Sequence, residues 1–134
     1  MESTSQRALG VLMLERGVPP GTPRPPPSPG SMLDPATFEF PVIMETVEGG
    51  WVESVIKGDP SLEPAFRAAA QRLATRGAVA ITAGCGFSIH RQEAVADKVP
   101  VPVFPLVADS LRRSSGLPVH DITTLCRATI DSIR

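Results

Sequence analysis

The sequence predicts a single α/β domain built on a parallel sheet, and three observations support this prediction. Continuous apolar runs, typical of parallel strands that are covered on both faces, occupy residues 8–14 and 78–82. A segment with helical periodicity lies between these runs, so strand and helix alternate along the chain. The length of 134 residues suits one domain, and an apolar content of 42% is ordinary for a globular protein.

The first apolar run, residues 8–14, is interpreted as a buried strand. A secretory signal has an apolar stretch of similar length, but Glu15 and Arg16 follow at once and no small-residue cleavage site is present. Residues 37–47 are expected to form a second strand, in which Pro41 indicates an edge position or a bend.

Prolines crowd the segment between these strands, residues 16–35. Proline fixes φ and lacks an N–H group, so this loop cannot be a helix or an inner strand. We expect it to be extended and mobile. A loop beside an active site is favoured over a proline-motif ligand, because the flanking pattern of such a ligand is missing.

The second half of the chain begins with a helix that Asp59 or Ser61 can cap and that Gly77 ends. Its buried face is expected to contain Leu62, Phe66, Ala69, Ala70 and Leu73. There follow a strand (78–82), a turn (83–86), a helix to about residue 98 and an extended segment (99–104). A helix (107–114), a strand (116–119) and a last helix from Asp121 complete the order. Residues 51–56 form an apolar cluster that we do not place. The expected architecture is a single Rossmann-like parallel sheet flanked by helices.

Composition excludes several classes of function. The net charge is −1, tyrosine is absent, and lysine and arginine are scattered, which argues against a nucleic-acid surface. No stretch approaches the roughly 20 apolar residues of a membrane span. The two cysteines do not make a disulfide framework. We expect a soluble, cytoplasmic protein.

The turn that contains Cys85 carries the strongest chemical signal. Ligands of open α/β sheets bind at the carboxyl ends of the strands, and Cys85 comes directly after a strand and before a helix. Gly84 and Gly86 allow a tight turn, and the amides of Gly86 and Phe87 could hold a carboxylate. The same amides would lower the pKa of the Cys85 thiol. The alternative is a small buried cysteine in a turn.

Other candidate groups favour structural interpretations. Cys126 lies on the apolar face of the last expected helix, among Ile122, Leu125 and Ile130. His90 and His120 match no zinc spacing with Cys85, so no metal is expected. A cysteine–histidine pair would form only if His120 folds toward Cys85. Arg24, Glu39 and Asp121 could each approach a substrate, but only Thr82 is close enough to Cys85 in the sequence to be named with it.

Residues 81–87, with the sequence Ile-Thr-Ala-Gly-Cys-Gly-Phe, resemble the first cysteine motif of the aspartate/glutamate/hydantoin racemase superfamily. The resemblance covers residues 8–104 and resumes at 105–125. Members have two similar α/β domains that face each other across a cleft, and a C-terminal segment that returns to the first domain. The resemblance therefore implies that residues 1–104 form the N-terminal part of domain one, that residues 105–134 complete it, and that most of domain two is missing.

The resemblance also implies a mechanism, in which two cysteines, one from each domain, move a proton at Cα without a cofactor. Cys85 matches the first cysteine, with Thr82, Gly86 and Phe87 as substrate-binding residues. The second cysteine would stand a few residues before Pro105, where this chain has Val-Pro-Val-Phe at 101–104.

The expected function is that of a racemase or isomerase acting on amino acids or related small carboxylates. With one cysteine missing, activity would need a partner chain, such as a second copy in a homo-oligomer. Alternatives are a non-catalytic remnant or interaction module of the same fold, and a one-cysteine decarboxylase-like enzyme. A miscalled gene sequence near Phe104 would also explain the missing half.

Overall fold

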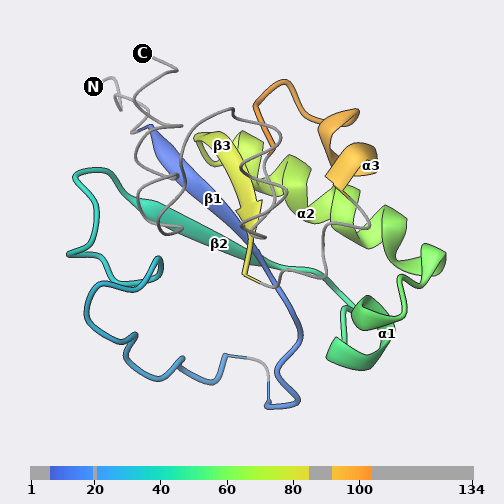
Figure 1. The fold of residues 1–134 in the computed structure, drawn as a ribbon, viewed down its shortest axis with the longest axis horizontal. Coiled ribbons are helices and arrows are strands. Elements are labelled where there is room, and N and C mark those ends of the chain that lie inside the picture. The colour runs from blue at the N-terminus through green and yellow to red at the C-terminus, as the bar shows by residue number, and fades with distance from the viewer. Residues whose placement is uncertain (1–6, 20, 85–91, 104–134) are drawn as a thin grey trace.

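Three parallel strands form the centre of the protein, in the order β2-β1-β3 (Figure 1). A computed structural model describes residues 7–19, 21–84 and 92–103. Strand β1 (Ala8–Met13) lies between β2 (Val42–Thr46) and β3 (Ala78–Ala83), and Leu9 is in register with Val42 on one side and Ala80 on the other. With helices packed against this sheet, the predicted α/β class is confirmed.

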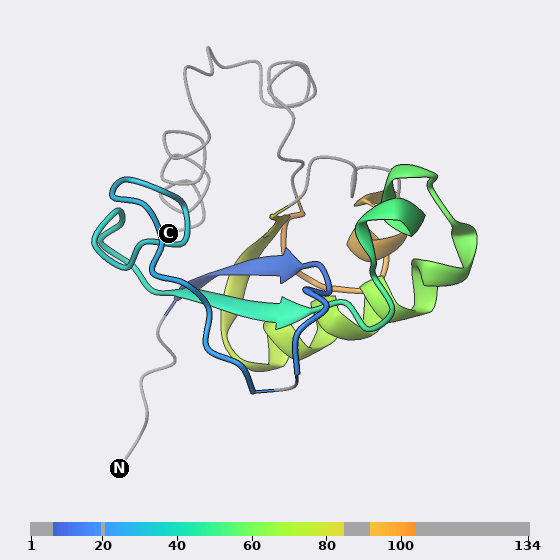
Figure 2. The ribbon, with the colours of Figure 1, turned by 90° about the horizontal axis from the view of Figure 1, so that it is seen from below.

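Helix α2 (Glu63–Thr75) covers one face of the sheet, and Figure 2 shows it running beneath all three strands. It buries the apolar stripe that its sequence predicts: Phe66, Ala69, Ala70 and Leu73 are each at most 1% exposed. These side chains share one core with the sheet residues Leu12, Ile81 and Ala83. Period-3.6 spacing therefore placed the buried face of this helix correctly.

Local residues define both ends of this helix. A 3-10 turn, η1 (Pro60–Leu62), leads into α2, and the Asp59 carboxylate accepts a hydrogen bond from the Ser61 N–H at 2.9 Å. Gly77 follows the helix with φ of 102°, a conformation that glycine adopts without strain. The predicted stop at Gly77 is confirmed, whereas Asp59 caps the 3-10 turn and α2 itself begins after Leu62 without a side-chain cap.

Gly10 of β1 allows α2 to lie close to the sheet. A Cβ atom at this position would be 3.0 Å from the Ala78 Cβ and 3.2 Å from the Leu73 Cβ. Any larger residue would therefore push the helix and strands apart.

The opposite face of the sheet is covered by the connection between β1 and β2. Met32 and Phe38 from this connection are buried against Leu9, Val11 and Ala80. The Phe38 and Phe40 rings stack with centroids 4.8 Å apart. Residues from 28 to 37 fold into successive hydrogen-bonded turns, so the expectation of an extended chain throughout residues 16–35 is wrong for its last part.

The second strand is shorter than residues 37–47, because β2 begins only at Val42. Pro41 has no N–H to donate, although its carbonyl accepts from the Leu9 N–H at 3.0 Å. The chain before Pro41 packs its aromatic rings on the sheet face instead of extending the ladder. The edge position that Pro41 indicated is confirmed within the three-stranded sheet.

The remaining described elements are short. The apolar cluster that the sequence left unplaced forms helix α1 (Val52–Ile56), and helix α3 (Gln92–Ala96) falls within the helix expected to end near residue 98. Val103 forms a parallel bridge with Ile81, so the extended segment runs beside β3. The expected elements from residue 107 onward lie outside the described residues. Among the residues described, no helix is both long and apolar enough to cross a membrane.

Candidate functional site

The chain leaves β3 tightly against the end of β1. The Gly84 N–H donates to the Leu12 carbonyl at 2.8 Å, and a Cβ at Gly84 would be 2.9 Å from the Met13 Sδ. A side chain at this position would have to displace Met13, so the start of the turn requires glycine or a shifted neighbour. Close packing on Met13 therefore explains the glycine at position 84.

Strand order makes this edge the expected place for a ligand. The connection from β1 leads to β2 on one side, whereas β3 lies on the other side of β1. Where the connections from two adjacent strands diverge in an open α/β sheet, a crevice forms outside their carboxyl ends. In this sheet the two strands are β1 and β3, and Cys85 follows β3 after one further residue, Gly84.

Thr82 is the one predicted site residue that lies within the described chain. It is in register with Val11 in the sheet and is 1% exposed. Its side chain is therefore enclosed by the strand and its neighbours. Cys85, Gly86 and Phe87 lie outside the described residues, as do His90, His120, Asp121 and Cys126.

A polar hollow of about 250 Å³ opens at the carboxyl ends of β1 and β2. Its walls include Glu15 and Arg16, which come just after Leu14 at the end of β1, Thr46 at the end of β2, and Arg24 from the proline-rich connection. The hollow therefore lies on the same edge of the sheet as the end of β3.

Two charged groups of the hollow are bound to backbone. Arg16 donates to the Thr22 and Pro23 carbonyls, each at 3.3 Å, and so ties the loop back to the end of β1. The Glu15 carboxylate accepts from the Gly49 N–H at 3.3 Å. These bonds hold both side chains at the rim of the hollow.

Arg24 differs from these two groups. It is partly buried and lines the hollow, but it makes no hydrogen bond or ion pair within the part of the chain that the structure describes. A guanidinium is always charged and presents several donors, so it is suited to bind a carboxylate. The described edge thus offers a cation that could receive an anionic ligand.

The sequence identified some of these residues and missed others. Arg24 was among the residues expected to approach a substrate, and it does lie at the carboxyl edge. Glu39 is exposed just before Pro41, at the opposite end of β2, so it does not join the hollow. Arg16 and Thr46 were not singled out, although their positions at strand ends are the signal that could have identified them.

Over residues 7–19, 21–84 and 92–103, no group of three or more His, Cys, Asp or Glu side chains is arranged to hold a metal ion. Comparisons with protein-family models, with curated proteins and with solved structures give no match, so the geometry of the carboxyl edge is the basis for any functional conclusion.

Proposed function

We propose that this chain is a racemase- or isomerase-type protein that uses the Cys85 thiol to move a proton at Cα of an amino acid or related small carboxylate. The observation that carries the proposal is the hollow at the carboxyl edge of the sheet, where Arg24 has no partner in the described chain. An anion-binding group at this edge fits a carboxylate substrate.

The local geometry at the end of β3 supports the same proposal. The Gly84 N–H is hydrogen-bonded to the Leu12 carbonyl, and Gly84 packs on Met13. Gly84, the residue before Cys85, is therefore held at the carboxyl ends of β1 and β3. In the proposed mechanism the Cys85 thiolate is the base that removes the Cα proton. The Gly86 and Phe87 amides hold the substrate carboxylate and stabilise the negative charge that develops on it.

Racemisation needs a second acid–base group on the other side of Cα. In the proposal this chain corresponds to domain one of a two-domain racemase fold, and a partner chain in a cytoplasmic homo-oligomer supplies the opposite group. No cofactor takes part.

One observation favours a second candidate function, an interaction module of the same fold. Trp51, Val52 and Ile56 in and beside α1 are 46–48% exposed, and Val18 is 44% exposed. Trp51 lies next to the loop that carries Val18, since a Cβ at Gly17 would be 3.7 Å from the Trp51 ring. Exposed apolar side chains that gather in one place are typical of interaction sites.

Proton exchange at Cα tests the enzymatic proposal without requiring complete racemisation. The purified protein is incubated in D₂O with a panel of amino acids and small carboxylic acids, and loss of the Cα proton signal is followed by NMR. We expect exchange with the wild type and with Cys126→Ala, and a loss of about 100-fold or more with Cys85→Ala. Equal rates for wild type and Cys85→Ala would end the proposal.

Binding measurements separate the two candidates. Calorimetric titration with the same acids should show binding that weakens about tenfold in Arg24→Gln, because a charged hydrogen bond is lost. Arg67→Gln is the matched control, since Arg67 lies on α2 and pairs with Glu63 at 2.7 Å, away from the hollow. Binding without proton exchange would indicate a non-catalytic acid-binding protein of the same fold, and the absence of both would leave the interaction module.

A further inference from the structure

Strand β2 is the edge strand of the described sheet, and half of its backbone groups point away from β1. Within the described residues it pairs with β1 only. The Pro41 carbonyl and the Val47 N–H bond to β1, at 3.0 and 2.8 Å. Backbone direction alternates along a strand, so the groups of Val42, Met44 and Thr46 face the open side.

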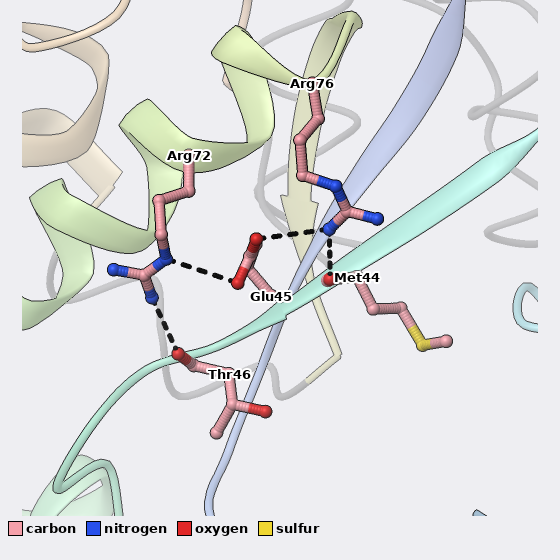
Figure 3. A network of polar contacts seen from close by, with 5 residues as sticks. All are labelled: Met44, Glu45, Thr46, Arg72 and Arg76. Carbon is pink, nitrogen blue, oxygen red and sulfur yellow. Dashed lines mark hydrogen bonds and ion pairs between the residues drawn. The ribbon is translucent and has the colours of Figure 1, made fainter. Parts of the chain in front are cut away.

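Two arginines of α2 reach over this open side (Figure 3). The Arg76 Nη1 donates to the Met44 carbonyl at 2.8 Å, and the Arg72 Nη2 donates to the Thr46 carbonyl at 3.1 Å. Both outward carbonyls in the second half of β2 are therefore occupied by side chains of the helix.

Glu45 holds the two arginines in place. Its two carboxylate oxygens accept from Arg72 Nε and from Arg76 Nη1, each at 3.2 Å. Arg72 lies in the last turn of α2 and Arg76 is its C-cap residue, four positions later. Like charges at this spacing repel each other, and the carboxylate between them offsets this repulsion. We call Arg72, Arg76 and Glu45 the edge cap.

The edge cap is more than a stabilising ion pair. The arginine side chains are 40% and 47% exposed, and ion pairs at such positions contribute little to stability. The bonds to Met44 and Thr46 have a different consequence, because they occupy the acceptors that an added strand would need.

The sequence of β2 makes such protection necessary. Val42, Ile43 and Met44 are apolar residues that favour strands, and Pro41 precedes them instead of interrupting them. An apolar edge strand with free backbone groups is a template for pairing with another chain. A second copy would offer the same strand, and antiparallel pairing across a twofold axis is the simplest such contact.

We propose that the edge cap closes β2 to strand addition and so prevents the protein from associating through β2 of a second copy. If β2 is closed in this way, a functional oligomer forms through a different surface of the protein. The proposal is independent of the chemistry proposed for Cys85, because none of its residues lies in the polar hollow except Thr46, whose backbone alone is involved.

Sedimentation velocity of the full chain over a range of concentrations tests the proposal. In Arg72→Gln/Arg76→Gln both carbonyls lose the guanidinium groups that reach them, because the glutamine amide sits on a shorter side chain. We expect self-association at least about tenfold tighter than in the wild type. Arg67→Gln is the matched control on the same helix and should behave as the wild type. Adding Thr46→Pro to the double variant removes an outward N–H and should reverse the association.

Each other outcome overturns the proposal. A folded double variant that associates no more than the wild type contradicts it, as does equal association of Arg67→Gln, which would point to loss of charge alone. Association that Thr46→Pro does not reverse would mean that another surface is responsible. If circular dichroism shows that the double variant is unfolded, the single variant Arg76→Gln replaces it under the same criteria, since it removes the guanidinium bound to the Met44 carbonyl and leaves Arg72 in place.

Discussion

The two faces of the sheet are covered in different ways. Helix α2 covers one face with side chains that are almost completely buried, such as Phe66 and Leu73 at 1% and 0% exposure. The connection between β1 and β2 covers the other face with Met32 and Phe38, which remain 9% and 7% exposed. A regular helix fits closely over a sheet, whereas an irregular segment is fixed at a few anchoring side chains.

Helix α2 and the β1–β2 connection also differ in how the hydrogen bonds of their backbone N–H and C=O groups are made. Within α2 the backbone hydrogen bonds of the helix pair these groups, and the Asp59 side chain caps the 3-10 turn that precedes it. The loop layer adds side chains to its short backbone turns: the Asp34 carboxylate accepts from the Ala36 and Gly30 N–H groups at 3.0 and 3.1 Å, and the Thr37 hydroxyl donates to the Ser31 carbonyl at 2.6 Å. A proline-rich segment can therefore act as a structural layer when side-chain hydrogen bonds and local turns replace the missing ladder.

Truncating the central ring of the helical face should have the largest effect. Phe66→Ala removes a side chain that is 1% exposed at the centre of the α2 core, where rigid neighbours cannot close the cavity. We expect the free energy of unfolding to fall by about 3–5 kcal/mol. Urea unfolding followed by circular dichroism measures it. A loss below about 1 kcal/mol would show that the helical face is not the main source of stability.

The equivalent change on the other face should cost less. Phe38→Ala removes a ring that stacks on Phe40, and the loop around it can partly collapse into the space. We expect a loss of about 2 kcal/mol in the same unfolding experiment, at the lower end of the effects seen for large core truncations. A loss equal to that of Phe66→Ala would mean that both faces are equally rigid.

Removing the capping carboxylates should have the smallest effect on stability. The amides whose exchange becomes faster should lie in a different layer for each variant. Asp59→Ala and Asp34→Ala should each lower stability by about 1 kcal/mol. Hydrogen exchange distinguishes them, because Asp59→Ala should speed exchange at Ser61 and the start of α2. Asp34→Ala should speed exchange at Gly30 and Ala36 only. Exchange that rises equally in both layers for either variant would contradict this separation.

The sequence by itself determined the elements whose bonds and burial are local. Helix α2, the capped turn at Asp59 that precedes it and its end at Gly77 follow from residues within one segment. Helical hydrogen bonds join neighbours, and the spacing of apolar residues defines the buried face. The strands at 8–14 and 78–82 were equally readable from their continuous apolar runs. At the candidate site, glycine before Cys85 was read from the sequence, and Gly84 indeed packs against Met13.

Only the tertiary structure decided what depends on distant segments. Arg72 and Glu45 are 27 residues apart in the chain, and no local pattern brings them together. The same holds for the packing of Phe38 in one cluster with Leu9, and for Arg24 and Thr46, which line the same polar hollow. Such contacts depend on how loops close and on which face of the sheet each segment covers. Both are determined by the packing of segments that are distant in the sequence.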